Sequence, residues 1–256
     1  MSQLSQRLIF GKKDILLQDS EGRQIRTFQK SDFLMSRGRY RVTEARLGDF
    51  SEGLLIEIEA PIEVEVTFEA QINANAPGAI AHAKVRGAIA HANADGAKAY
   101  ADARGAKAYA KVRGAEAHAN ARGAEAYANV DGAKAYANFP EAEAHAKARG
   151  AIAYADELGA RAYANARGAE AHAKVRGTKA YADAPGALAY AKARGAEAYA
   201  EWREAEAHAN ARGAKAHAKA PGAKAYANKP GAEAHAKWIG AEIHATVPGA
   251  LAIPLS

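Results

Sequence analysis

The sequence predicts an all-β protein whose main part is a two-sided parallel β-solenoid with an alanine core. Glycine recurs every nine residues from Gly78 to Gly249, with Glu141 and Glu204 in its place twice. Small apolar and polar residues alternate between these glycines, and a period of two is typical of strands that bury one face. Proline often directly precedes the glycine, and a Pro-Gly pair favours a turn. We therefore expect strands of about seven residues joined by short corners.

The repeat unit reads Gly-Ala-x-Ala-(Tyr/His)-Ala-x-x-x, numbered here from the glycine as position 1. Alanine fills positions 2, 4 and 6 almost everywhere, with Thr178 and Ile243 as exceptions. An alanine-rich helix is the competing interpretation, because alanine has the highest helix propensity. Alternating alanines would leave no apolar stripe on a helix, however, and prolines at position 9 would interrupt it repeatedly. These prolines are Pro77, Pro140, Pro185, Pro221, Pro230 and Pro248.

The charged residues separate two β architectures. In a solenoid with 18-residue coils and nine-residue half-coils, positions 3 and 7 give 12 opposite-sign and 5 like-sign pairs, including Lys98/Glu116 and Lys179/Glu197. An antiparallel β-meander gives 6 opposite-sign and 10 like-sign pairs. Opposite charges on neighbouring strands are stabilising and like charges destabilising, so the solenoid is preferred and the meander is the alternative. A nine-residue coil scores as well as the 18-residue coil, but it is too short to close.

The chain divides into four predicted parts. Residues 1–50 form a small N-terminal β module that caps or attaches, with strands near 8–10, 14–17, 23–28 and 40–43 and a hairpin turn at 19–22. Residues 51–77 are transitional strands whose inward positions shrink from Ile and Val to Ala. Residues 78–249 are the nonapeptide solenoid, and residues 250–256, which include Leu251, Ile253 and Leu255, form a tail or cap.

Position 5 carries an uninterrupted column of histidine and tyrosine, which is the strongest candidate for a binding surface. Its members alternate between the two faces of the solenoid, so that His82 stacks on Tyr100 and only His217 and His235 are neighbouring histidines. Histidine is the commonest metal ligand, which makes His217 and His235 weak metal candidates. No carboxylates accompany them at the spacing of a metal site, so an aromatic stacking ladder is the preferred interpretation. The candidate ladder residues are His82, His91, Tyr100, Tyr109, His118, Tyr127, Tyr136, His145, His217 and His235.

Basic residues give a second candidate surface. Arg37, Arg39 and Arg41 cluster before the repeats, and Arg104 and Arg113 are among the arginines at position 9. Together with the aromatic column they are suited to nucleic acid or another anionic polymer. Acidic residues interrupt the predicted faces, however, and the net charge of +6 is the balance of basic and acidic residues that are interspersed along the chain. Nucleic acid is therefore a disfavoured partner.

No motif for catalysis is present. The chain has no phosphate loop, no Gly-x-Ser-x-Gly, no His-Glu-x-x-His and no cysteine. Identical units also multiply each side chain, whereas an active site needs a unique constellation. We expect no enzyme activity, no cofactor and no small-molecule substrate, and the repeat lacks the calcium signature of nonapeptide β-rolls.

These observations predict a structural or adhesive rod, such as a component of a fibre, spike or filament, attached through its N-terminal module. Self-association or a structural assembly partner is expected. The alternative is a binding module that uses the Tyr, His and Arg ladders for nucleic acid, anionic polymer or metal. No signal peptide or transmembrane segment is visible in the sequence, which favours a cytoplasmic or virion-associated protein.

Overall fold

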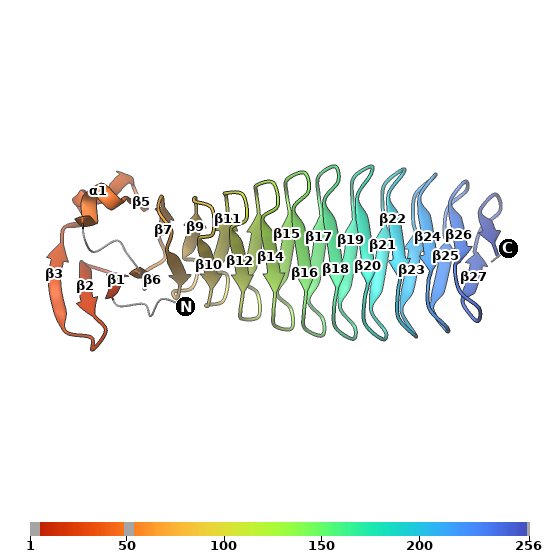
Figure 1. Ribbon diagram of the computed structural model, residues 1–256, viewed down its shortest axis with the longest axis horizontal. Coiled ribbons are helices and arrows are strands. Elements are labelled where there is room, and N and C mark those ends of the chain that lie inside the picture. Colours follow the sequence, from red (N-terminus) through yellow and green to blue (C-terminus); the bar gives the residue numbers. More distant parts are fainter. Residues whose placement is uncertain (1–5, 49–53, 255–256) are drawn as a thin grey trace.

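A computed structural model describes residues 6–48 and 54–254. The start of the chain, the predicted join near residue 50 and Leu255 lie outside the described residues. Two sheets run the length of an elongated molecule, with the N-terminal module at one end and the last repeats at the other (Figure 1). One sheet has 15 strands and the other 13, and we name them sheet A and sheet B. The predicted two-sided parallel solenoid is confirmed and the meander alternative is wrong.

The strands of the solenoid alternate between the two sheets. In sheet A they are β6 (Leu54–Ile58), β8 (Gln71–Ala74), β10 (Ile89–Ala92), β12 (Lys107–Ala110), β14 (Glu125–Ala128), β16 (Glu143–Ala146), β18 (Arg161–Ala164), β20 (Lys179–Ala182), β22 (Glu197–Ala200), β24 (Lys215–Ala218), β26 (Glu233–Ala236) and β28 (Leu251–Ile253). In sheet B they are β7 (Glu63–Val66), β9 (Ile80–Ala83), β11 (Lys98–Ala101), β13 (Glu116–Ala119), β15 (Lys134–Ala137), β17 (Ile152–Ala155), β19 (Glu170–Ala173), β21 (Leu188–Ala191), β23 (Glu206–Ala209), β25 (Lys224–Ala227) and β27 (Glu242–Ala245).

Each strand residue of the regular repeats pairs in parallel with the residue one coil later. Lys98 lies opposite Glu116 and Lys179 opposite Glu197, which is the 18-residue register that the charges predict. The earliest coils are shorter, because Leu55 pairs with Gln71. The coil is therefore two repeat units, and odd and even units belong to different sheets.

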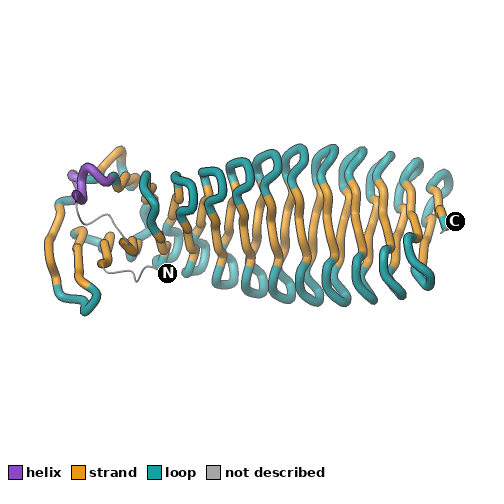
Figure 2. The backbone as a smooth tube through the Cα atoms, in the orientation of Figure 1, coloured by secondary structure: helices purple, strands orange, loops and turns teal. Residues whose placement is uncertain are grey.

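The strands span positions 3–6 only, so they are four residues long rather than the expected seven (Figure 2). The strands are shorter because a tight turn runs from position 8 of one repeat unit to position 2 of the next. In one such turn the Ala88 amide donates a hydrogen bond to the Val85 carbonyl at 3.2 Å. Arg86 and Gly87 are the central residues of this turn, and Gly87 has φ 81°. A type II turn requires a left-handed conformation at its second central residue, which explains the glycine. It also favours proline at its first central residue, which explains the frequent proline before the glycine.

The solenoid is filled by alanine. The side chains at positions 2, 4 and 6 are fully buried through the regular coils, for example Ala126 and Ala144. Thr178 is also fully buried, and its hydroxyl donates to the Val175 carbonyl within the corner. Alanine removes little area from water, so continuous backbone hydrogen bonding between neighbouring coils supplies much of the stability.

The N-terminal module extends both sheets with antiparallel strands. In sheet A, β1 (Gln6–Phe10) pairs in parallel with β6 and antiparallel with β2 (Ile15–Asp19), which pairs with β3 (Gln24–Phe28). In sheet B, β5 (Arg39–Val42) pairs in parallel with β7 and antiparallel with β4 (Leu34–Ser36). A short 3₁₀ helix, η1 (Lys30–Asp32), and a single helical turn, α1 (Glu44–Leu47), complete the module.

Large side chains fill the module and shrink toward the repeats. Phe10 packs against Phe33 and Tyr40 with ring centroids 5.8 and 5.7 Å apart. Ile56 and Val64 continue the core into the first coils, after which alanine takes over as predicted. The module thus continues both sheets beyond the first coils and has larger buried side chains than the repeats.

The last coil has a different character. β27 and β28 are the final strands of their sheets, and the residues of β28 are all exposed. Leu251 is 52% exposed and Ile253 is 37% exposed. No helix in the described part of the chain is long and apolar enough to cross a membrane.

Candidate functional site

The position 5 rings form two continuous stacks, one on the outer face of each sheet. Centroids of successive rings lie 4.5 to 5.1 Å apart and their planes differ by 6° to 24°. His82 stacks on Tyr100, and His118 lies between Tyr100 and Tyr136, as predicted. The parallel register imposes this stacking because it places each ring directly over the next.

The predicted ladder residues divide between the two stacks. The sheet B stack contains His82, Tyr100, His118 and Tyr136, and continues through Tyr154, His172, Tyr190, His208, Tyr226 and His244. The sheet A stack contains His91, Tyr109, Tyr127, His145, His217 and His235, and includes Tyr163, Tyr181 and Tyr199.

Polar neighbours occupy the rims of the rings. Within a strand, the Tyr127 and Tyr199 hydroxyls donate to the position 3 carboxylates of Glu125 and Glu197. Lysines at position 7 fold over rings of the preceding coil, as where Lys174 Nζ lies 3.7 Å from the centroid of Tyr154. The ladder rings therefore contact one another and their polar neighbours, which matches a stacking role. Buried ring nitrogens of His91, His118, His172 and His217 nevertheless have no hydrogen-bond partner among the described residues.

Burial in the stacks shifts ring pKa values in the direction that favours the neutral form of the side chain. Burial lowers the pKa of His91 to about 4, with a further contribution from Lys111. It likewise lowers the pKa of His217 to about 4, with His235 adding to the effect. Burial raises the pKa of Tyr181 to about 12. These shifts favour the neutral forms of His91, His217 and Tyr181, as stacking inside a half-buried column requires.

His217 and His235, the weak metal candidates, are neighbours in the sheet A stack. Their ring centroids are 4.9 Å apart and the rings are nearly parallel, at 24°. His235 Nε2 is already 2.9 Å from Glu233 Oε2. Within the described ranges no three His, Cys, Asp or Glu side chains gather as a metal site would require.

The position 3 charges form ion pairs along the coil register. Lys98 Nζ lies 3.0 Å from Glu116 Oε2, and Lys179 Nζ lies 3.5 Å from Glu197 Oε2. Such exposed pairs are individually weak. Like charges interrupt the columns in sheet A, where Glu125 lies opposite Glu143 and Arg161 opposite Lys179.

The basic candidates do not form one surface. Arg104 follows β11 of sheet B and Arg113 follows β12 of sheet A, so they lie on opposite edges of the solenoid. Arg39 Nη2 lies 2.9 Å from Glu63 Oε1, and Arg41 pairs with Glu65. Arg37 lies just before Arg39, in the turn between β4 and β5. The carboxylates of Glu63 and Glu65 thus offset the charges of Arg39 and Arg41, and the separation of Arg104 from Arg113 prevents a continuous phosphate track.

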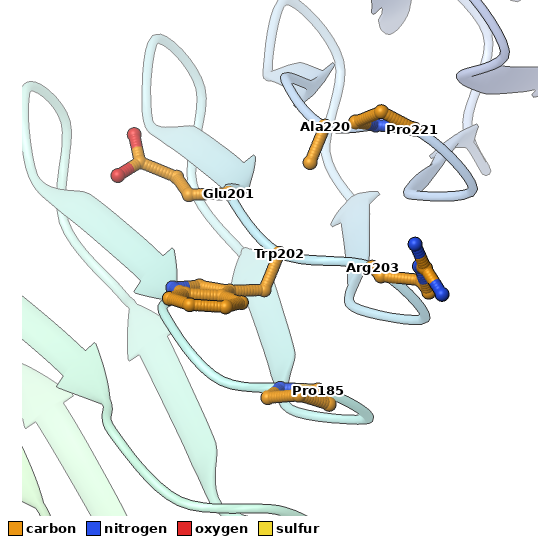
Figure 3. Close-up of a pocket in the computed structure, with 6 residues that line it drawn as sticks. All are labelled: Pro185, Glu201, Trp202, Arg203, Ala220 and Pro221. Carbon is orange, nitrogen blue, oxygen red and sulfur yellow. The ribbon is translucent and has the colours of Figure 1, made fainter.

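One concave feature was not singled out from the sequence. A shallow, open groove of about 500 Å³ lies over the corners that follow β20, β22 and β24 (Figure 3). Trp202 is its largest lining side chain and is 54% exposed. The other lining residues are Pro185, Glu201, Arg203, Ala220 and Pro221. The sequence signal was available, because Trp202 and Trp238 both occupy position 8, separated by two coils.

No protein-family model matches the chain, and the curated proteins contain no significantly similar sequence. Among solved structures, the chain is similar to a TibC-catalysed, hyper-glycosylated fragment of TibA, with 13% sequence identity and a TM-score of 0.30. That match covers 84% of this chain and 94% of the TibA fragment. The fold assignment therefore depends on the strand register itself rather than on a relative.

Proposed function

We propose that the protein is a rod-like structural or adhesive component of a fibre, spike or filament, attached through its N-terminal module and without catalytic activity. The observation that carries this proposal is the uninterrupted parallel register from β6 to β28. A regular solenoid holds its two ends at a fixed separation, and each coil adds about 4.8 Å to that separation. Side chains at equivalent repeat positions contact one another in neighbouring coils, as in the stacked rings at position 5 and the ion pairs at position 3.

Exposed apolar residues at both ends support assembly. The outer strands of the N-terminal module, β3 and β4, expose Ile25, Leu34 and Met35 by 42%, 51% and 43%. The last coil exposes Leu251 and Ile253 on the terminal strand of sheet A. Open strand edges with apolar side chains favour pairing with another edge. We therefore include self-association through the ends in the proposal.

Sedimentation velocity and negative-stain imaging of the full chain test the proposal. We expect particles one solenoid wide, with end-joined species that increase with protein concentration. Ile253→Lys should reduce the joined species, because a charge on an edge strand opposes pairing. Leu158→Lys is the matched control, because Leu158 is 60% exposed on a lateral corner. Compact particles would contradict the rod, whereas monomers at every concentration would contradict self-association alone.

A further inference from the structure

Both tryptophans of the chain lie on one edge of the solenoid. We define the tryptophan edge as the corners 183–186, 201–204, 219–222 and 237–240, which lead from β20, β22, β24 and β26 into sheet B. Trp202 and Trp238 occupy position 8 of the second and fourth corners and are 54% and 55% exposed. Ala220 holds the same position in the corner between them. The edge therefore presents two exposed indoles separated by one small residue.

The groove described above begins at the first of these indoles. Trp202 lies toward Pro185 of the preceding corner, with Arg203 on its other side (Figure 3). Ala220 and Pro221 line the groove from the following corner. Because the groove is open and shallow, it suits a ligand that lies along the edge rather than one that is enclosed.

The spacing of the indoles follows from the coil. Each coil rises about 4.8 Å, so equivalent atoms of Trp202 and Trp238 are separated by about 10 Å along the axis. A sugar ring in an extended β1,4-linked chain spans about one coil, and successive rings are flipped. The same face of the sugar therefore recurs at every second ring, which corresponds to the two-coil separation of the tryptophans.

The charges on the edge indicate a neutral ligand. Glu201 accepts an ion pair from Lys219 Nζ at 2.9 Å. Three acidic and three basic side chains occur in the four corners, so the edge has no net charge to attract a polyanion. Carboxylates accept hydrogen bonds and ammonium or guanidinium groups donate them, which matches hydroxyl groups that do both. The six residues are Asp183, Glu201, Glu204, Arg203, Lys219 and Lys237.

We propose that the tryptophan edge is a binding site for a neutral, extended β1,4-linked oligosaccharide, which stacks alternate rings on Trp202 and Trp238. Arg203 and the Glu201–Lys219 pair lie beside the first indole and donate or accept hydrogen bonds to the sugar hydroxyls. This inference rests on the proposed rod, since the coil sets the spacing of the two indoles, and it gives the adhesive role a ligand.

Titration of the full chain with cellohexaose and with the hexamer of β1,4-linked N-acetylglucosamine tests this site. Binding is followed by tryptophan fluorescence and by calorimetry. We expect saturable binding of at least one hexasaccharide, and no binding of maltohexaose, whose α1,4 linkage does not give an extended chain. Trp202→Ala and Trp238→Ala should each weaken binding by at least about fivefold.

Phe139→Ala is the matched control, because Phe139 also occupies position 8 and is 42% exposed, but its corner follows β15 on the opposite edge. It should leave the affinity unchanged. Trp202→Tyr keeps an aromatic ring and should retain part of the affinity if the indole acts by stacking. Circular dichroism confirms that each variant is folded, so a loss of binding is not a loss of structure.

Three results would overturn the inference. They are no binding of either β1,4-linked hexamer, equal weakening by Phe139→Ala and Trp202→Ala, or preferential binding of a proline-rich peptide or a thymidine oligonucleotide at the same tryptophans. Salt-dependent binding of the oligonucleotide would identify nucleic acid as the ligand. None of these results affects the particle shape measured by imaging, so failure of the binding site and failure of the rod are distinguishable.

Discussion

Arg122 donates two hydrogen bonds to the Glu141 carboxylate of the neighbouring coil, from Nε to Oε2 at 2.6 Å and from Nη2 to Oε1 at 2.9 Å. Glu141 accepts these bonds in a left-handed backbone conformation with φ 62°, at a position that glycine normally occupies. The other such residue, Glu204, has φ 61° and no ion-pair partner within 4.0 Å in the part of the chain that the structure describes. A comparison of the two corners can therefore distinguish the cost of the left-handed backbone, which both residues share, from the contribution of the ion pair, which only Glu141 has.

Glu204→Gly should stabilise the protein by about 0.5–1 kcal/mol, because glycine adopts a positive φ without the steric cost that a Cβ imposes. Glu141→Gly should gain less, because it also removes the pairing with Arg122. Thermal unfolding of the two variants beside the parent checks this. A lower midpoint for Glu204→Gly would show that the corner does not strain glutamate.

Asp183→Asn should raise stability at pH 7. Burial and the neighbouring carboxylate of Glu201 raise the pKa of Asp183 to about 6, and its Oδ1 has no hydrogen-bond partner among the described residues. The folded chain thus holds an unfavourable charge above this pKa, and its removal should gain about 1–2 kcal/mol after allowance for solvent screening. The gain should shrink as the pH falls through 6, where Asp183 becomes protonated.

Asp156→Asn is the control for this substitution. Asp156 occupies the same repeat position on the opposite edge, and its Oδ1 also accepts no hydrogen bond among the described residues. That atom lies 3.2 Å from Lys174 Nζ, however, so Asp156 has an ion-pair partner. Its replacement should bring no gain, because it discards a favourable pair. Equal stabilisation by both substitutions in urea unfolding would argue against a specific cost at Asp183.

The histidines of the ladder should make the solenoid acid-sensitive. The folded pKa values of His91 and His217 are about 4, whereas an unfolded histidine has a pKa of about 6.5. Between these two pH values the unfolded chain binds more protons than the folded chain. The free energy of unfolding is therefore highest above about pH 6.5, and it falls toward pH 4 by up to about 1.4 kcal/mol per pH unit for each group. Urea unfolding across this range measures the slope.

His91→Tyr should flatten that slope, because tyrosine keeps the stacked ring and does not titrate in this range. The measurement belongs in an Asp183→Asn background, since protonation of Asp183 acts in the opposite direction over part of the range. His244→Tyr, at the exposed end of the sheet B stack, is the control. An unchanged slope in His91→Tyr would show that His91 is not held neutral.

Ala144→Val should destabilise the protein by about 1–3 kcal/mol. Ala144 is fully buried at position 4 between the two sheets, and extra methyl groups in a close-packed core force neighbouring atoms apart. Ala148→Val, at position 8 of the following corner, is only partly buried and should change stability little. Similar unfolding midpoints for both variants would show that the interior is not tightly packed.

The sequence predicts the regular part of the fold because two independent patterns agree. Alternation gives strands, and the charge pairs disfavour the meander. The 18-residue register, which places Lys98 on Glu116, then follows because a nine-residue coil is too short to close. The shorter strands were missed because alternation continues through the corner at position 2, where Ala88 is buried although it closes a turn. The pairing of β1 with β6 was beyond the sequence, because the N-terminal module has no repeat to define its neighbours.

The candidate surfaces were predicted less completely. The stacks are confirmed, because periodicity alone determines which rings are neighbours. The groove beside Trp202 depends on the direction in which the indole leans and on the small Ala220 next to it, and neither follows from alternation. The pairing of Arg39 with Glu63 likewise depends on a strand neighbour that the sequence does not specify.

The alternation of repeat units between two sheets has a consequence at the level of the gene. Loss or gain of one whole coil keeps every later side chain on its own face and changes only the length of the molecule. Loss of a single repeat unit would exchange the two faces for all residues beyond it, so that Trp238 would move to the opposite edge from Trp202. Length variation among natural alleles should therefore occur in steps of two repeat units wherever the two faces have different tasks.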